Sequence, residues 1–294
     1  MGGNTEFELT DLAPAPEEEW QRMLRFVGWG QADREAASRS LEVLFRRGPE
    51  LVVGTYDYLR RVPETAAILG WEQRIDAAHL EERRRFFTLW LARTLGLDTS
   101  DEFARYLFRA GKYHAGYGPR RIHTPPEYVV TSLGLVQAAF ARYMAEAQLP
   151  AEIIAGAMAA WSKYLAVQLN QMLLGYHAAR ALDTGHFPVQ FRLFGRLRPL
   201  LGTQEIQVWA EAGACVEDVL RKFLNYFPEA RLEAMDRVWH AVEKAETLWT
   251  EVVPAYVPRR GWRILLNGRD LSYAGGFHVP VQAQDEIAIF PPGR

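Results

Sequence analysis

The spacing of hydrophobic residues changes near residue 183, and this change divides the chain into two regions. Between residues 20 and 182, apolar residues recur at intervals of three and four, which is the period of helices with one buried face. Beyond residue 187 apolar and polar residues alternate, as they do in 189–193, and a period of two is typical of strands. The pattern therefore predicts a helical region followed by a region that contains a sheet.

Glycines and prolines interrupt the helical region often enough to predict seven or eight helices. The last of these, 151–182, is long and carries a near-continuous apolar stripe. In the second region, the order strand, strand, helix, strand, strand predicts an α+β roll with a helical insertion at about 232–256. The residues that suggest this insertion are Val238, Val242, Ala245 and Trp249. We expect Trp249 in the core, whereas Trp239 fits either a core or an interface.

These patterns predict an N-terminal arm (1–19), a helical domain (20–182), a linker (183–187) and an α+β domain (188–294). The fold class is α+β and multidomain, with an all-α domain first. The arm is acidic and contains Pro14, so we expect it to be loosely held.

One histidine stands at the end of a predicted helix face. Phe103, Leu107, Ala110 and His114 are spaced four, three and four apart, which places them in one stripe and points the imidazole inward. A buried polar group needs a hydrogen bond or a metal, because leaving it unpaired is costly. His114 is therefore either a satisfied core histidine or a metal ligand.

Composition excludes several classes of function. The formal net charge of the 294 residues is −2, so no basic excess points to nucleic acid. With Cys215 as the only cysteine, the chain cannot form an internal disulfide or a zinc site built on thiolates. We see no signal peptide and no apolar run of membrane-spanning length, so we expect no membrane association and a cytoplasmic location.

Four segments of the helical region, taken in order, resemble the protoglobin and globin-coupled-sensor family. They are 25–33 (RFVGWGQAD), 56–65 (YDYLRRVPET), 109–118 (RAGKYHAGYG) and 125–128 (PPEY). The resemblance implies a globin-like domain that binds haem b. His114 matches the ligand of the haem iron, whose open sixth position takes dioxygen or another diatomic gas.

The same resemblance implies further haem-pocket residues. Tyr56 matches a tyrosine that donates a hydrogen bond to the gas, although an aromatic core residue is the alternative. The other residues expected at the haem are Phe86, Phe87, Trp90, Tyr117 and Tyr128, although Phe87 and Trp90 fit the core of the domain as well as the wall of the pocket. In the loop that follows His114, the residues Arg120, Arg121 and His123 either contact a haem propionate or lie in solvent.

The second region resembles the MoaD/ThiS family of ubiquitin-like β-grasp proteins. The segments that carry this resemblance are 191–198 (FRLFGRLR), 216–220 (VEDVL), 266–270 (LNGRD) and 285–292 (DEIAIFPP). Members of the family carry sulfur on a C-terminal Gly-Gly that enters an E1-like enzyme. This chain ends Gly293-Arg294 instead, so the resemblance implies a docking module for an E1-like or molybdopterin-synthase-type partner.

Together these features predict a haem-based sensor of a diatomic gas, with oxygen the foremost candidate, rather than an enzyme. The signal would pass along the helix 151–182, which we also expect to form a homodimer, to a β-grasp output module. The alternative is a sulfur carrier for molybdopterin-type cofactor biosynthesis with a regulatory globin domain. A haem enzyme acting on nitric oxide or peroxide, and a globin fold without haem, also remain open.

Overall fold

The computed structural model describes residues 5–243 and 249–292, which form two compact units. Residues 16–177 make up the helical unit. Residues 178–294, together with the start of the chain up to residue 15, make up the C-terminal unit. The start of the chain therefore belongs to the same unit as its end.

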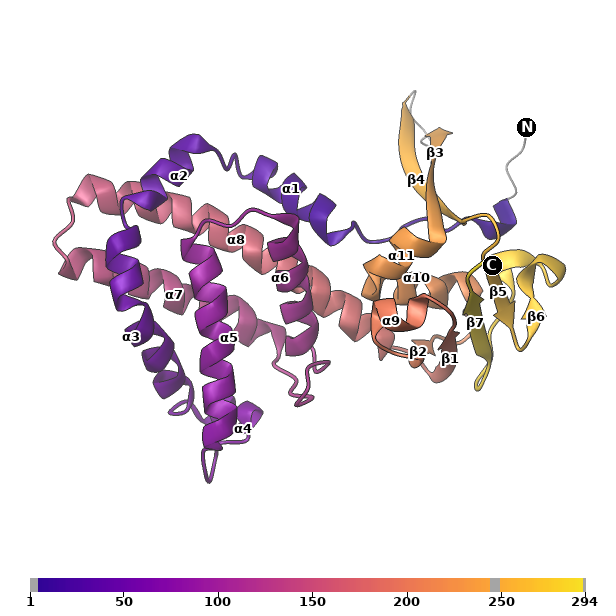
Figure 1. Ribbon diagram of the computed structural model, residues 1–294, viewed down its shortest axis with the longest axis horizontal. Helices are drawn as coiled ribbons and strands as arrows, with labels where there is room; N and C mark the ends of the chain where they lie inside the picture. Colours follow the sequence, from indigo (N-terminus) through magenta and orange to yellow (C-terminus); the bar gives the residue numbers. More distant parts are fainter. Residues whose placement is uncertain (1–4, 244–248, 293–294) are drawn as a thin grey trace. The chain divides into compact units, whose positions relative to one another are not determined.

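Eight α-helices build the described part of residues 16–182, in agreement with the predicted seven or eight (Figure 1). They are α1 (Pro16–Phe26), α2 (Gln31–Ser38), α3 (Leu41–Leu59), α4 (Pro63–Leu69), α5 (Ala77–Leu95), α6 (Asp101–His114), α7 (Pro126–Glu146) and α8 (Ala151–Leu182). The last residues of α8 already belong to the C-terminal unit. None of the helices described is long and apolar enough to cross a membrane.

Local capping explains where the helices near the candidate site begin. Ser100 precedes α6, and its hydroxyl accepts a hydrogen bond from the Phe103 amide at 3.2 Å. Asp76 precedes α5 and accepts from the amides of Ala78 and His79. Each contact satisfies a helical N–H that would otherwise lack a partner.

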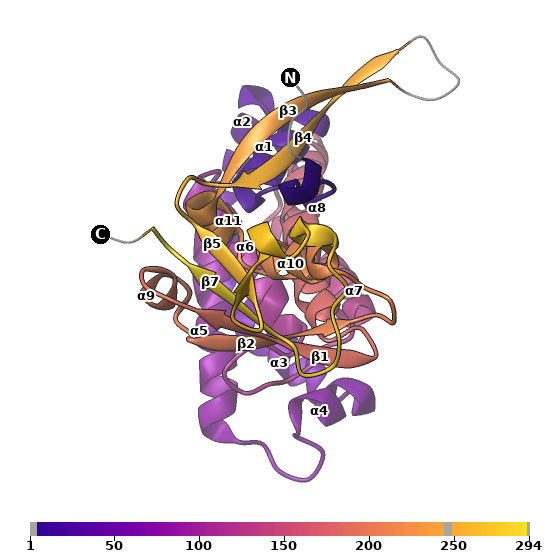
Figure 2. The same ribbon diagram turned by 90° about the vertical axis from the view of Figure 1, so that its right-hand side faces the viewer.

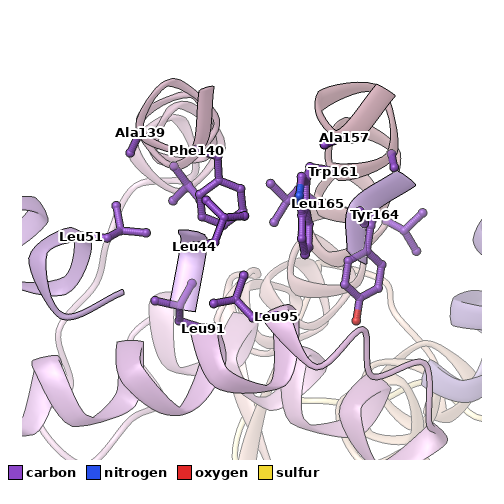
Figure 3. Packing of buried hydrophobic residues seen from close by; sticks show 14 of the residues in the cluster. Leu44, Leu51, Leu91, Leu95, Ala139, Phe140, Ala157, Trp161, Tyr164 and Leu165 are labelled. Atoms are coloured by element: carbon purple, nitrogen blue, oxygen red, sulfur yellow. The ribbon is translucent and has the colours of Figure 1, made fainter. Parts of the chain in front are cut away.

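The core of the helical unit contains residues of α1, α3, α5, α6, α7 and α8. Figure 3 shows Leu44, Leu95, Phe140 and Trp161 pointing toward one another from α3, α5, α7 and α8. The rings of Phe140 and Trp161 meet edge to face, with their centroids 5.3 Å apart. Burial of such side chains stabilises the fold by roughly 1.5–3 kcal/mol each.

The C-terminal unit contains a five-stranded mixed sheet in the order β2-β1-β7-β5-β6. Its strands are β1 (Phe187–Leu193), β2 (Glu205–Ala210), β5 (Arg263–Leu266), β6 (Arg269–Asp270) and β7 (Glu286–Phe290). Strands β1 and β7, the first and last in the chain, are parallel neighbours, and the other neighbouring pairs are antiparallel. The helix α10 (Val216–Tyr226) packs on this sheet, where Phe223 stacks on Phe191 at 4.8 Å. This is the β-grasp arrangement, so the predicted fold class is confirmed.

Two short α-helices and three 3-10 turns complete the described part of the C-terminal unit. They are α9 (Leu197–Leu201), α11 (Pro228–Ala234), η1 (Thr5–Phe7), η2 (Leu271–Tyr273) and η3 (Gly276–His278). The two turns near the end of the chain connect β6 to β7.

The prediction of a helical insertion at 232–256 is wrong. Strands β3 (Met235–Glu243) and β4 (Thr250–Pro258) pair antiparallel and form a ribbon of their own (Figure 2). The segment is rich in valine and contains Pro254, residues that favour strands or break helices. Trp249 is 76% exposed and so lies outside the core, and Trp239 is 60% exposed. Ala245 lies outside the described residues.

The expectation of a loosely held N-terminal arm is also wrong. Helix α1 begins at Pro16, so the acidic run 17–19 forms its first turn, where negative charge is favourable. Before it, Leu9 is fully buried in the C-terminal unit and pairs with Tyr256 of β4.

Candidate functional site

His114 is the last residue of α6, and its ring is held in one orientation. Phe103 and Leu107 of the predicted stripe are fully buried, and His114 itself is half-buried. Its Nδ1 lies 2.7 Å from the carbonyl oxygen of Ala110, one turn earlier. A carbonyl can only accept, so Nδ1 carries the hydrogen and Nε2 keeps its lone pair.

The electrostatic surroundings keep this imidazole neutral. Burial holds the pKa of His114 below its ordinary value, and the nearby Arg83 guanidinium lowers it further, while the bond to Ala110 opposes the shift. Within the described residues, Nε2 has no hydrogen-bond partner. His114 therefore presents a neutral, oriented nitrogen with a free lone pair, which is the form that binds metals.

Tyr56 on α3 faces α5. Its hydroxyl donates to the backbone carbonyl of Arg83 at 3.0 Å. Burial raises the pKa of Tyr56 to about 12, so the hydroxyl keeps its proton at neutral pH. The ring packs edge-on against Trp71 and Phe87, with centroid separations of 6.3 and 6.2 Å.

The predicted aromatic residues of α5 point in different directions. Phe87 contacts both Tyr56 and Trp90. The indole of Trp90 donates to Gln168 on α8 at 2.8 Å, which ties it to the core. Phe86 instead lines a crevice of about 20 Å³ between α5 and the loop that follows α6. The structure thus brings Tyr56, Phe87 and Trp90 together and places Phe86 apart from them.

The two remaining predicted tyrosines flank the loop after His114. The amide of Tyr117 donates to the Lys112 carbonyl at 3.1 Å, which joins it to the end of α6. Tyr128 is half-buried in the first turn of α7. In the described part of the chain, the ring of Tyr128 makes no ring contact with the other predicted residues.

Arg83 is the main residue of this region that the sequence did not indicate. It lines the crevice with Phe86 and lies close enough to affect the pKa of both Tyr56 and His114. Its Nε donates to Nε2 of His79 at 2.9 Å, while the Trp71 indole donates to the other nitrogen of the same ring at 3.2 Å. A neutral imidazole has only one accepting nitrogen, so His79 cannot satisfy both donors.

The loop after α6 uses its polar side chains in three different ways. Arg120 pairs with Glu82 at 2.5 Å and with Asp76 at 3.4 Å. The ring of His123 lies 2.7 Å from the hydroxyl of Tyr176 on α8. Arg121 is exposed and has no ion pair within the described residues. Of the three basic residues predicted for a propionate, only Arg121 is uncommitted.

Helices α6 and α8 cross with their backbones in contact. A Cβ atom at Gly111 would lie 1.8 Å from the carbonyl oxygen of Met172. A Cβ atom at Gly175 would lie 1.9 Å from the carbonyl oxygen of Phe108. Both glycines are therefore required, and the crossing is three residues from His114.

A buried glutamine joins the same two helices to α1. Gln171 of α8 is fully buried, and its Nε2 donates to the carbonyls of Pro16 at 2.9 Å and Ala104 at 3.2 Å. Pro16 begins α1, and Ala104 lies on α6. The helix that ends at His114 is thus tied to both helices through which the chain enters and leaves the unit.

Comparison with known proteins gives one family match, described as protoglobin, over residues 16–181. No curated protein matches the chain. Among solved structures, the chain is similar to the solution structure of small archaeal modifier protein 1 from Methanosarcina acetivorans. That match has 25% identity and a TM-score of 0.27, and it covers 36% of this chain and 93% of the other.

Two crystal structures of small archaeal modifier protein 1 from Haloferax volcanii are also similar. The first has 20% identity and a TM-score of 0.25, and it covers 36% of this chain and 96% of the other. The second has 19% identity and a TM-score of 0.26, and it covers 37% and 100%.

Proposed function

Because the chain belongs to the protoglobin family through residues 16–181, we propose that its helical unit binds haem b through His114 and senses a diatomic gas, with dioxygen foremost. The family supports a globin-type haem sensor. The identity of the gas, the individual residues and the output are our proposal.

The observation that carries the proposal is the state of the His114 ring. Its Nδ1–H donates to the Ala110 carbonyl, which fixes the tautomer and makes Nε2 a better donor of its lone pair. The lowered pKa keeps the ring neutral, so no proton competes for that nitrogen at pH 7. These features fit a haem ligand better than a core histidine, which would have both nitrogens satisfied.

The other residues fit the surroundings of a haem. When bound, haem supplies an iron whose sixth position takes a small gas. Tyr56 holds a proton on its hydroxyl, and Phe87 packs between its ring and Trp90. Tyr56 now donates to the Arg83 carbonyl, so to face a gas its hydroxyl would have to give up that bond.

Two arginines are suited to hold the carboxylates of the cofactor. Arg121 has no ion pair among the described residues. Arg83 donates to Nε2 of His79, whose neutral ring cannot accept there and also accept from the Trp71 indole at Nδ1. Exchanging that contact for a carboxylate would give Arg83 a charge-assisted hydrogen bond. Arg120 is already paired with Glu82 and Asp76, and His123 with Tyr176.

We propose that the signal leaves the helical unit through α8. A shift of α6 acts on α8 directly, because Gly111 and Gly175 leave no side chain between the two backbones. The same shift reaches Pro16 through Gln171. Such coupling requires two conformations that the gas distinguishes. Equal gas affinity with and without a partner on the C-terminal unit would contradict it.

We also propose that a homodimer forms through α8. The exposed residues along one side of this helix are small: Ala155, Ala159, Ser162 and Ala166. Beside them, α7 exposes Val130 and Leu135. We expect Ala159→Arg to halve the mass measured by light scattering after gel filtration. The control is Ala32→Arg on α2, which should remain dimeric.

For the C-terminal unit we propose a docking role toward an E1-like or molybdopterin-synthase-type partner. The alternative of a sulfur carrier needs a free C-terminal tail. Pro291 packs on Gly195, and Pro292 packs on Gly261, so the chain is held down to its last described residue. Gly293 and Arg294 lie outside the described residues. A thiocarboxylate on a trimmed Gly293 after co-expression with an E1-like enzyme, found by mass spectrometry, would favour the carrier.

The visible spectrum of the purified protein tests the proposal most directly. We expect a Soret band in the wild type and its loss in His114→Ala. The matched control is His123→Ala, which removes a histidine from the neighbouring loop and should keep the band. A wild type that remains colourless after haem supplementation would show that the unit is a globin fold without haem.

A further inference from the structure

After the 3-10 turn η1, the chain around Leu9 runs along the C-terminal unit, beside β4 (Figures 1 and 2). Leu9 and Tyr256 exchange both backbone hydrogen bonds, each 2.9 Å long. This short segment therefore adds to the free edge of the β3–β4 ribbon, as a bound peptide does in strand addition. From here on, the arm means residues 5–13 only, which is a shorter segment than the predicted arm 1–19.

The C-terminal unit holds the arm mainly by its backbone. Arg221 donates to the Thr10 carbonyl at 3.0 Å, and Arg231 donates to the Ala13 carbonyl at 2.6 Å. The amide of Ala13 donates to the side chain of Asn225 at 2.9 Å. Hydrogen bonds of this kind recognise the backbone of an extended peptide, whatever its side chains are. They do not require that the peptide be covalently linked to residue 16.

Specific side chains of the arm fill sites on the same surface. Leu9 is fully buried, and Phe7 packs edge-on against Phe277 with centroids 5.3 Å apart. Between them, the carboxylate of Glu8 pairs with His240 at 3.2 Å. The surface thus selects an apolar residue, an acidic residue and a second apolar residue in succession.

Close approach of the backbone also shapes this surface. Gly276 has φ +71°, and a Cβ atom there would lie 2.2 Å from the Glu6 carbonyl oxygen. The arm can lie in place only because this position carries no side chain.

The arm fills only part of the available groove. A cavity of about 770 Å³ continues past Phe7 and Glu8 along the ribbon, where it is lined by His240, Trp262, Asp270 and Tyr273. This volume is within the range of sites that bind ligands. A longer peptide would therefore gain contacts that the arm does not make.

We propose that the C-terminal unit carries a strand-addition site for an extended peptide of a partner protein, which the arm occupies within the chain. The partner segment is apolar–acidic–apolar, like Phe7, Glu8 and Leu9. Pro14 and Pro16 keep the connection after the arm stiff and extended, so the arm can leave the site as a piece. The proposal does not depend on haem.

Peptide binding to the full chain tests the site. Leu9→Asp places a charge in a buried apolar position and should release the arm. A fluorescent peptide of residues 5–15 is then titrated and followed by anisotropy. We expect saturable binding to Leu9→Asp and at least tenfold weaker binding to the wild type. In the wild type the tethered arm competes at an effective concentration on the order of 1 mM.

Further variants define what the site reads. The peptide that itself carries Leu9→Asp should not bind. Adding Arg231→Met to the released chain should weaken binding at least tenfold, because the Ala13 carbonyl loses its donor. The matched control is Arg192→Met, which removes an arginine from β1 that pairs with Glu286.

Equal binding to wild type and variant, or none to a variant with native near-ultraviolet circular dichroism, would overturn the proposal. If Leu9→Asp loses that native signal, the same titration is made on Leu9→Ala, which leaves a cavity instead of a charge, and failure to bind there overturns it equally. Dimers of the wild type that the peptide dissociates would show that a second copy of the chain, not a partner protein, supplies the segment.

Discussion

The helical unit and the C-terminal unit differ in how their buried polar atoms are satisfied. In the helical unit, Gln168 Nε2 and Gln171 Oε1 are buried without a hydrogen bond, and so are the ring nitrogen of Trp29 and Nε of Arg84. In the C-terminal unit, Glu233 and His240 also contain such atoms, but each faces a polar partner: Glu233 pairs with Arg196 at 2.5 Å, and His240 Nε2 lies 3.2 Å from the Glu8 carboxylate.

This difference indicates different demands on the two units. An unpaired buried polar atom costs about 1–3 kcal/mol, so a region built only for stability would not keep several. In the helical unit, Gln168 and Gln171 lie on α8 and Arg84 lies on α5, while Trp29 precedes α2 and stacks on Tyr164 of α8. His79, which cannot satisfy both of its donors, belongs to the same region. Local rules of this kind fail mostly at functional sites.

The largest expected effect tests whether the two units unfold independently of each other. Phe223 is fully buried and stacks on Phe191, so Phe223→Ala should destabilise the C-terminal unit by about 4 kcal/mol. Denaturant unfolding followed by far-ultraviolet circular dichroism should show an early transition, while the Soret band keeps its wild-type midpoint. Leu200→Ala, at an exposed position of α9, is the control. A simultaneous shift of both transitions would show that the units unfold together.

A somewhat smaller effect is expected at the crossing of α6 and α8. Gly111→Ala forces the two backbones apart and should cost about 3 kcal/mol of helical-unit stability. The control is Gly134→Ala on α7, where a Cβ atom meets nothing within 4 Å. That change should stabilise the unit by roughly 0.5–1 kcal/mol, since alanine favours helix. Thermal unfolding of the haem-free protein measures both, and equal Tm values would contradict the close crossing.

The sequence could predict the orientation of His114 but not all of its surroundings. The stripe that includes Phe103 and Leu107 follows from helical periodicity, and a carbonyl one turn before His114 is a consequence of the same helix. Arg83 and Gln171 came to light only in the structure. Their partners lie on other helices, and one sequence carries no sign of which helices pack together.

In the C-terminal unit, the wrong prediction of a helix at 232–256 came from a spacing that fits both a helix and a strand. Val238 and Val242 are four apart, which suits a helix, but the cross-strand partners Ala255 and Glu251 show that they lie on one face of a ribbon. Pro254 was the signal against a helix. The burial of Leu9 had no local signal, because its partner Tyr256 is far away in the sequence.

A moderate effect is expected at Tyr56. Removing its hydroxyl in Tyr56→Phe should speed dioxygen release about tenfold, because one hydrogen bond contributes about 1.4 kcal/mol. Stopped-flow displacement by carbon monoxide measures the rate. Tyr106→Phe is the matched control, since that hydroxyl reaches only the Phe86 carbonyl at a long 3.5 Å. An unchanged rate in Tyr56→Phe would remove Tyr56 from the gas site and leave it a core residue.

The smallest expected effect is a difference between the two units in how their stability depends on pH. Burial, with Arg83 and Arg120 nearby, holds the pKa of His79 below its ordinary value of 6.5, although Glu82 and Asp76 oppose the shift. The unfolded chain therefore binds this proton more readily, and the contribution of a neutral His79 to stability is lost as the pH falls below about 6.5. In the C-terminal unit, hydrogen bonds from Ser272 hold the pKa of Asp270 below 3.8, so the corresponding loss begins only near that value.

At pH 5.5 the haem-free helical unit should therefore unfold at lower denaturant concentration than at pH 7.5, while the C-terminal transition stays in place. His114 shifts in the same direction, since burial lowers its pKa too, so the difference between wild type and His79→Gln isolates His79. His79→Gln should reduce the dependence on pH, because an amide does not titrate in this range. The prediction fails if both transitions are equally sensitive to acid and His79→Gln leaves that sensitivity unchanged. The buried polar groups around His79 would then not distinguish the helical unit from the C-terminal unit.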